Sequence, residues 1–385
     1  LITIPPCCGF EFKNTLGHSM IIYPIAGGLI VALVLGDLFG TILLARAGGG
    51  IVSPLINRTV WMSFRWADKH AGAGGRIMGF AGPVLLVLIV STWVVTAILG
   101  FALIYQPMLG SQIVASSGST ATDFSTALYF SGFNFSTLGL GDLVPQTSTA
   151  KLLAVGEACS GFAVFTMAVS YTLNIYSAVN ERDTLALLLH ADTARTDDPA
   201  VALAGLCPGG TPAADAGSAL HTLSGMVSSL LQTHYSYPLA HYYRRRDPSL
   251  SMVRIADHVL MLVALAKASL APISNASLLQ SRGLISLDAA GTRLICEVVD
   301  MMQFSKESCG FDTEMMRPWF DQAYDRLTNE GIDLTTKETA WAIFKEIVNR
   351  FKPQVLSLAK QLGYEEAHFI YARSARESVF TPQSQ

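Results

Sequence analysis

The organisation of this chain follows from one short stretch, Thr137-Leu138-Gly139-Leu140-Gly141-Asp142. The stretch follows an aromatic run, 127–136, and lies between two long apolar segments. Glycine adopts left-handed dihedrals without steric cost, so glycine at every second position lets right-handed and left-handed residues alternate. The backbone carbonyls of such a stretch line a narrow axis and replace the hydration shell of a cation. The stretch therefore predicts a carbonyl-lined ion path.

The composition divides the 385-residue chain into two parts. Overall the chain is 51% hydrophobic and only 14% charged, whereas an ordinary soluble domain has about 25% charged residues. The apolar excess lies in the first half, and charge reaches an ordinary soluble density only from about residue 181 onward. We therefore expect a membrane module followed by a soluble one. The net charge of -3 gives no reason to expect nucleic acid as a partner.

Three apolar segments are long enough to cross a bilayer as helices, which takes about 20 residues: 20–44, 83–105 and 152–176. The segment between the second and third carries no Lys or Arg from 106 to 124, whereas the loop between the first and second carries Arg46, Arg58, Arg65, Lys69 and Arg76. Because positive charge marks cytoplasmic loops, this loop is predicted to be cytoplasmic. The N-terminus and the mouth of the ion path are then outside, and the C-terminal region is inside.

The residues between the second and third spans are too few for another crossing. They suffice for a half-helix over 123–136 and an extended return. Non-helical backbone at membrane depth is tolerated where protein or a water-filled path surrounds it. The C-terminal end of the half-helix carries partial negative charge, which favours a cation. The predicted fold is mainly α, with transmembrane helices, a re-entrant pore helix and a filter, followed by a helical bundle.

Residues 83–178 resemble the pore module of prokaryotic tetrameric potassium channels: outer helix, pore helix, filter and inner helix. That family's filter usually reads TVGYGD, and this chain has TLGLGD followed by Pro145. The resemblance implies a homotetramer that conducts K⁺ as its transported ion, without a further cofactor. It also implies ion coordination by the filter residues Thr137, Leu138, Gly139, Leu140 and Gly141, with Asp142 at the outer mouth.

Leu140 departs from the family pattern because it replaces the filter tyrosine. Leucine cannot donate a hydrogen bond to the aromatic side chains that brace such a filter, although Tyr129 and Phe130 occupy the bracing positions of the pore helix. Leucine does occur here in some potassium-selective pore loops of the two-pore subfamily. Potassium is therefore the first choice, and a weakly selective cation pore is the alternative.

The third span carries Gly161, about 20 residues after Gly141, where the family often has a gating hinge. Close helix packing is an equally good interpretation, because small residues let membrane helices approach. Beyond it, apolar side chains recur at helical spacing. They either line a cavity, form a hydrophobic gate or pack in a core: Phe162, Phe165, Val169, Leu173 and Tyr176.

Two carboxyl groups inside predicted spans need partners, since a charge near the bilayer centre costs at least a few kcal/mol. We expect Glu157 to brace the filter through Asn134 or Ser136, because Phe133 stands where some family members have a pore-helix glutamate. A carboxyl bonded to a neighbouring helix is the alternative. For Asp37 the sequence offers no partner, and helix contact is its expected role.

Gating by voltage is not expected, because the one span before the pore module lacks an Arg or Lys at every third position. The 46–78 loop instead carries aromatic and apolar residues among its arginines. They predict either a short helix at the membrane interface, in contact with lipids, or a loop anchored by two tryptophans: Leu55, Val60, Trp61, Phe64 and Trp66.

After residue 180 we expect a linker, 181–215, rich in Asp, Pro and Gly from 192 onward. Periodic apolar patterns then predict a helical domain over 216–385, with helices at 216–235, 250–271, 284–304, 312–329 and 335–362. Residues 244–246, Arg-Arg-Arg, are read as a solvated turn or a contact to anionic lipid. Four histidines gather in one region and could bind a divalent metal, but Cys or acidic residues at ligand spacing are missing, so buried or capping histidines are the preferred interpretation and no metal is assigned: His221, His234, His241 and His258.

The sequence thus predicts an outer N-terminal segment 1–19, a first span 20–45, a cytoplasmic loop 46–78, a pore domain 79–180, the linker and the C-terminal domain. No nucleophile elbow, HExxH or phosphate loop points to an enzyme, and no catalytic residue is assigned. The expected function is a homotetrameric potassium channel subunit in the cell membrane, regulated by a ligand that the sequence leaves unidentified. A membrane-anchored sensor or enzyme, with the C-terminal domain as its working part, is the alternative.

Overall fold

The structure, a computed structural model, describes residues 13–43, 53–72, 75–301, 310–365 and 368–369, with the backbone alone at 13–20, 43 and 54. Most of the predicted outer segment 1–19, Arg46 and the last residues of the helix predicted to end at 304 lie outside this part. The chain forms two compact units: Leu1–Thr59 with Val84–Asn174, and Val60–Pro83 with Ile175–Gln385.

Three helices of the described residues are long and apolar enough to cross a membrane, as the sequence predicts. They are α1 (Lys13–Leu43), α3 (Ala81–Tyr105), which follows the short helix η2 (Met78–Phe80), and α5 (Ser148–Asp192). Their apolar windows expose most of their residues in the single chain. Exposure of that extent suits helices whose solvent is lipid or whose partners are other chains.

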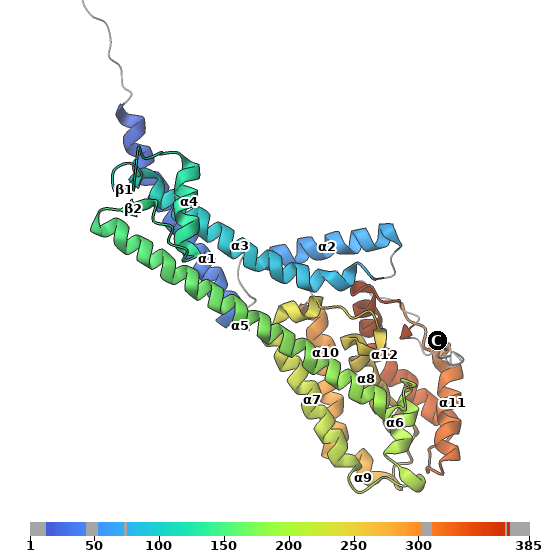
Figure 1. The fold of residues 1–385 in the computed structure, drawn as a ribbon. Coiled ribbons are helices and arrows are strands. Elements are labelled where there is room, and N and C mark those ends of the chain that lie inside the picture. Colours follow the sequence, from blue (N-terminus) through green and yellow to red (C-terminus); the bar gives the residue numbers. More distant parts are fainter. Residues whose placement is uncertain (1–12, 44–52, 73–74, 302–309, 366–367, 370–385) are drawn as a thin grey trace, which may run out of the picture. The chain divides into compact units, whose positions relative to one another are not determined.

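A re-entrant arrangement occupies the residues between α3 and α5. The short helix η3 (Gln106–Met108) leads to strand β1 (Ile113–Ala115), and helix α4 (Phe124–Phe135) precedes strand β2 (Leu143–Pro145). At 1.5 Å per residue, the 12-residue α4 is about 18 Å long, little more than half of a bilayer core of about 30 Å. Figure 1 shows α4 beside the N-terminal half of α5, with the two strands next to them. The half-helix prediction agrees with this arrangement.

Strands β1 and β2 form an antiparallel pair that the sequence analysis did not anticipate. Ile113 pairs with Pro145, Val114 with Val144 and Ala115 with Leu143. The pair ties the residues that follow the TLGLGD segment, 137–142, to the residues that precede α4. The ends of the loop around α4 are therefore fixed to each other.

Asp37 of α1 has partners that the sequence could not name. Its Oδ2 accepts hydrogen bonds from the indole Nε1 of Trp93 in α3, at 2.9 Å, and from Ser53 Oγ, at 3.2 Å. The same two helices approach closely at Gly27, where a Cβ atom would lie 2.4 Å from the carbonyl oxygen of Gly100. Asp37 therefore acts as a polar contact between helices, which is the role expected for it.

Helix α2 (Ser53–Ala71) occupies much of the loop between the first two spans. Arg58 and Arg65 are exposed, as are Leu55 and Trp66, whereas Trp61 is completely buried. The predicted short helix is therefore present over Ser53–Ala71, and only one of its two tryptophans is exposed. Trp61 instead packs edge to face against Tyr242, with ring centroids 5.2 Å apart.

The predicted linker 181–215 contains more regular structure than expected. Helix α5 continues to Asp192, helix α6 runs over Pro199–Gly205, and η4 covers Pro208–Gly210. The charged residues after 180 resemble the end of a membrane span, but Leu185, Ala186 and Leu189 follow at helical spacing and are buried in the second unit. Their burial stabilises the extra turns of α5.

The remaining helices form the predicted bundle around α8 (Met252–Ser269), in which nearly every residue is buried. Helices α7 and α10 pack together, and α6, α10 and α12 pack on α8. The five predicted helices are present with ends within a few residues, apart from an N-terminal part of the fourth that is 3₁₀: α7 (Ala216–Ser236), α8, α10 (Arg282–Met301), α11 (Arg317–Asn329) and α12 (Lys337–Gln361). Shorter pieces join them: η5 (Pro238–Tyr242), η6 (Pro248–Leu250), α9 (Ala276–Leu279) and η7 (Thr313–Met316).

Candidate ion-conducting site

The backbone of the TLGLGD segment alternates as its glycine spacing predicts. The φ angles are +59° at Thr137, +56° at Gly139 and +79° at Gly141, whereas Leu138 and Leu140 are not left-handed. Glycine takes this conformation freely, but a residue with a side chain pays roughly 1 kcal/mol or more for it. Thr137 therefore holds a strained conformation at the junction between α4 and the segment.

Hydrogen bonds determine which way the peptide groups of this segment point. The N–H of Thr137 donates to Asn134 O at 2.9 Å, and the N–H of Leu138 donates to Phe133 O, also at 2.9 Å. A peptide unit is planar and trans, so each carbonyl points away from the N–H that follows it. The carbonyl of Thr137 therefore points away from α4. The longer bond from Gly139 N to Phe133 O, 3.4 Å, directs the carbonyl of Leu138 in the same way.

The segment lies at the surface of the single chain. Leu138 is 69% exposed and Leu140 is 56% exposed, and the other residues from Ser136 to Asp142 are exposed too. Large apolar side chains at such exposure in a rigid segment indicate that other atoms cover them in the working molecule. The single chain leaves this segment uncovered.

Asp142 connects the end of the segment to three parts of the first unit. Its Oδ2 accepts a hydrogen bond from the hydroxyl of Tyr129 at 2.9 Å, and its backbone carbonyl accepts one from Ser116 N at 2.8 Å. Its Oδ1 accepts from Leu143 N at 3.1 Å. In the sequence, Tyr129 occupies a bracing position and Leu140 offers its hydroxyl no partner. The structure shows that Asp142 is the acceptor for this hydroxyl.

Aromatic rings pack behind α4, as expected for the bracing positions. Phe130 is edge to face with Tyr105 of α3, with ring centroids 4.8 Å apart. Phe133 packs against Tyr129 and Phe130, at 5.3 Å and 5.2 Å between centroids. Such pairs contribute about 0.5–1.5 kcal/mol each beyond their buried area. The rings hold α4 against α3 whatever residue occupies position 140.

Gly161 allows α5 to approach the end of α4. A Cβ atom at this position would lie 1.9 Å from the carbonyl oxygen of Phe135, a distance that requires the backbone to shift. This contact gives the close-packing interpretation of Gly161 a physical basis. The hinge interpretation stays a prediction.

Glu157 contacts α4, but through a residue that the sequence analysis did not select. Its Oε1 lies 2.5 Å from Ser131 Oγ, and Ser131 Oγ also lies 2.9 Å from the carbonyl oxygen of Ile98 in α3. The expected partners are wrong: Ser136 Oγ bonds to Gly132 O of its own helix, and Asn134 Nδ2 has no partner within the described residues. Ser131 is three residues before Asn134, so it presents the same side of α4 one turn earlier, at the level of Glu157.

The apolar stripe of α5 is uncovered in the single chain. All five of its members are exposed: Phe162, Phe165, Val169, Leu173 and Tyr176. Cavity lining and contact with other chains both require such exposure. The structure brings only two of the four histidines together, His234 and His241, and the described residues contain no group of three or more metal-ligating side chains.

Comparison with known proteins agrees with the position of this site. Residues 84–178 match the model of a protein family described as "Ion channel". The chain is also similar to the uncharacterized membrane protein YdjJ of Bacillus subtilis (strain 168), with 28% identity over 246 residues that cover 62% of this chain and 69% of that protein. No solved structure matches significantly. The chain is a membrane protein with several apolar helices, and the match to an ion channel family covers α3, α4, the TLGLGD segment and α5 up to residue 178.

Proposed function

We propose that this protein is a homotetrameric channel subunit that conducts K⁺ passively across the cell membrane. The observation that carries the proposal is the alternating backbone of the TLGLGD segment, whose first carbonyls point away from α4. Rows of such carbonyls replace the water around a dehydrated cation. The match of residues 84–178 to an ion channel family supports passive ion conduction.

The exposure of the segment supports an assembly of several chains. One strand of carbonyls coordinates an ion from one side, so several chains must surround a common axis. The uncovered side chains of Leu138, Leu140 and the α5 stripe then meet their counterparts on other copies. Four copies are the number that the resemblance to tetrameric channels implies.

Selectivity for K⁺ depends on how firmly the segment is held. The Tyr129–Asp142 hydrogen bond and the aromatic contacts of Phe130 and Phe133 brace it, in place of the bond that Leu140 cannot make. A weakly selective cation channel is the second candidate, and it is favoured by the apolar side chain at position 140.

The orientation is proposed from charge. We infer that the α2 region is cytoplasmic because it carries four positive charges: Arg58, Arg65, Lys69 and Arg76. The C-terminal domain is then on the same side of the membrane, and the TLGLGD segment faces outward. Exposed Trp66 and Leu55 suit contact of α2 with the lipid interface. The C-terminal domain then regulates or assembles the pore, and gating does not rely on a charge-bearing sensor helix.

Reversal potentials of the purified protein in planar bilayers, under opposed K⁺ and Na⁺ gradients, test class and selectivity together. Gly139→Ala is expected to abolish most of the current, because alanine is strained at φ +56°. Gly118→Ala is the matched control: it carries the same kind of strain, at φ +78°, in a loop outside the proposed ion path.

Three results would contradict the proposal: no ion flux from correctly folded protein, a monomeric mass in mild detergent, or equal currents from Gly139→Ala and the wild type. A reversal potential that does not distinguish K⁺ from Na⁺ would instead identify the weakly selective channel. A membrane-anchored sensor or enzyme would keep its C-terminal activity in Gly139→Ala.

A further inference from the structure

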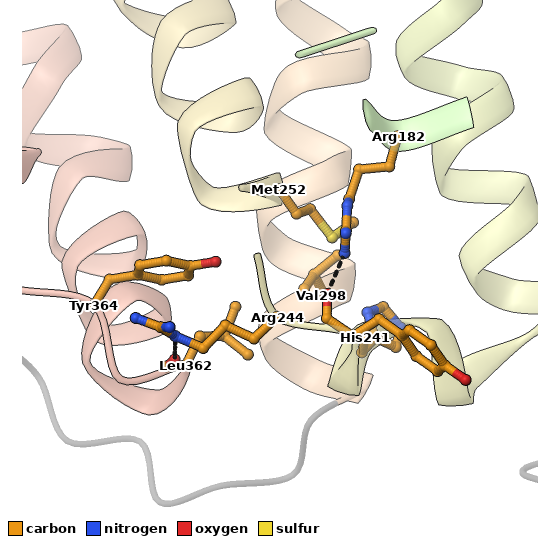
Figure 2. A pocket seen from close by; sticks show the side chains of 8 residues that line it. Arg182, His241, Arg244, Met252, Val298, Leu362 and Tyr364 are labelled. Atoms are coloured by element: carbon orange, nitrogen blue, oxygen red, sulfur yellow. Dashed lines mark hydrogen bonds between the residues drawn. The ribbon is translucent and has the colours of Figure 1, made fainter. Parts of the chain in front are cut away.

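The second unit contains a polar cluster where the extension of α5 meets the segment after η5. A small cavity marks the place, and Figure 2 shows Arg182 reaching from α5 toward His241 and the backbone at Arg244. Arg182 is almost completely buried, and its Nη1 donates to the carbonyl oxygen of Tyr243 at 2.7 Å. This bond ties the continuation of the third membrane helix to the C-terminal domain.

Arg244, which follows Tyr243 in the sequence, connects this segment to the turn before α3 and to the end of α12. Its guanidinium donates to the carbonyl oxygens of Gly75 at 2.7 Å, Leu362 at 2.9 Å and Gly363 at 3.1 Å, and it lies 4.3 Å from the ring centre of Tyr364. Gly75 belongs to the turn between α2 and α3. The guanidinium of Arg244 therefore holds three backbone carbonyls within the protein. The expectation of a solvated turn or lipid contact at 244–246 is wrong for this residue.

We call Arg182, Arg244 and the backbone of 243–244 the arginine clasp. It connects the turn before α3, the extension of α5 and the end of α12 through charge-assisted hydrogen bonds to backbone carbonyls. Such bonds are roughly twice as strong as neutral ones. Both helices that flank the proposed ion path therefore continue into segments that the clasp holds.

A pair of buried imidazoles lies against the clasp. The rings of His234 in α7 and His241 in η5 stack with centroids 4.5 Å apart and planes 18° from parallel, and neither is exposed. Within the described residues, none of their four ring nitrogens has a hydrogen-bond partner. Polar groups buried without partners are rare and costly, and they often mark a functional requirement.

The charges around the pair are unequal. Arg182 is the cation that acts on both rings. From α5, the carboxylate of Glu181 bonds to Ser229 and Thr233 of α7, and Asp183 pairs with Arg182 and Arg245. The other residues that line the cavity beside His241 contribute apolar groups, two phenols and the guanidinium of Arg244: Met252 of α8, Val298 of α10, Leu362 and Tyr364 after α12, and Tyr243 and Arg244.

From this geometry we propose that the His234–His241 pair is a proton-binding regulatory site that releases the arginine clasp when the cytoplasm becomes acidic. Each imidazole accepts one proton on a ring nitrogen. The resulting cations repel each other and the guanidinium of Arg182, and they need water that the buried site does not offer. When the segment 241–244 separates from α5, this repulsion is relieved and water reaches the two imidazolium ions. The inference rests on the proposed function only for its link to the current.

Proton linkage gives the direction and the size of the pH effect on release of the clasp. Burial lowers the pKa of His234 well below 6.5 and the pKa of His241 to about 4, with Arg182 acting in the same direction. A hydrated imidazole has a pKa of about 6.5, so the released state binds more protons below that pH. At pH 5.5, His241 alone shifts the equilibrium toward release by about tenfold relative to pH 7.5, and His234 adds to this shift.

The test measures two properties of the full-length protein in bilayers or nanodiscs, at pH 7.5 and 5.5 on the side of the C-terminal domain. The first is the current. The second is hydrogen exchange of the backbone amides at 180–185 and 243–246, corrected for the intrinsic effect of pH. In the wild type, acid is expected to change the current several-fold and to speed exchange about tenfold.

The variants are His234→Phe and His241→Phe, singly and together, because a phenyl ring keeps the stack but cannot bind a proton. The double variant is expected to lose the response, and each single variant should keep only the part that the remaining histidine carries. His241→Gln, neutral and polar, replaces them if the phenyl variants do not fold. The matched control is His221→Gln, an exposed histidine of the same helix, which should keep the full response.

An unchanged acid response in the double phenyl variant would overturn the inference, and so would loss of the response in His221→Gln. If no current exists at any pH while exchange at 243–246 responds as expected, the channel proposal fails and the proton site stands. If current is present but neither property responds to acid, the proton site fails alone.

Discussion

Asp142 accepts three hydrogen bonds. Two of the donors are backbone N–H groups, so only the bond from the Tyr129 hydroxyl can be removed by replacing the donor's side chain. Tyr129→Phe keeps the ring contact with Phe133 but loses this bond to the exposed carboxylate, so the end of the segment is held less firmly. We expect a several-fold lower K⁺ to Na⁺ permeability ratio, measured from reversal potentials, with the oligomer intact. Asp142→Asn and the double variant complete a cycle. Strictly additive effects would show that the two side chains do not act together.

The hydroxyl of Ser131 contacts both Glu157 and the carbonyl oxygen of Ile98, so substitutions at position 157 test what the Glu157 contact contributes. Glu157→Gln is expected to be nearly neutral, because the amide N–H donates to Ser131 Oγ while Ser131 donates to Ile98 O. Glu157→Ala removes the contact and leaves a cavity, at a cost of about 2–3 kcal/mol. Thermal unfolding of the protein in detergent measures both. A glutamine variant as unstable as the alanine variant would mean that the contact requires the negative charge.

At the scale of helices, α8 and α12 are joined by a completely buried ion pair. Lys352 Nζ lies 2.5 Å from Asp257 Oδ1, and desolvation lowers the pKa of Lys352 while Asp257 opposes that shift. Asp257→Ala leaves a buried cation and should destabilise the domain by about 3–5 kcal/mol. Because Arg254 also lies 3.8 Å from Asp257, Asp257→Leu with Lys352→Met should restore only part of that loss. Denaturant unfolding followed by tryptophan fluorescence measures the differences in the free energy of unfolding.

The control is Arg350→Ala, which removes an exposed pair with Glu346 on α12 and should cost under about 1 kcal/mol. A double variant no better than Asp257→Ala would contradict the argument.

Helix by helix, periodicity predicted the fold well and distant pairing poorly. The three spans and the five later helices follow from apolar spacing, and the left-handed conformations at Gly139 and Gly141 follow from residue type. The β1–β2 pair, the Tyr129–Asp142 bond and the Ser131–Glu157 contact join residues 13 or more positions apart, and no local pattern encodes such pairings. The boundary at 180 was misplaced because the charges there suggest a helix end, while the burial of Leu185 and Leu189 depends on other helices.

For the molecule as a whole, buried histidines predict how stability depends on pH. Burial lowers the pKa of His258 to about 4, with Arg254 acting in the same direction and Asp197 and Asp257 opposing it. The folded pKa lies below the unfolded value of about 6.5, so the stabilisation is complete above pH 6.5 and is lost as pH falls toward 4. His258 alone contributes up to about 1.4 kcal/mol per pH unit in that window. Melting of full-length His258→Phe from pH 7.5 to 4.5 should be less pH-dependent than melting of the wild type. Identical pH profiles would contradict a buried neutral His258.

The two units are interleaved along the chain, because residues 60–83 belong to the second unit although residues 84–174 belong to the first. Trp61 and Met78 are fully buried in a core whose other members come mostly from residues 185–369. During synthesis these side chains leave the ribosome long before their packing partners, and two membrane helices are made in between. The second unit therefore closes only after both of these helices have been synthesised, and a protein truncated after α5 would leave Trp61 and Met78 without most of their core.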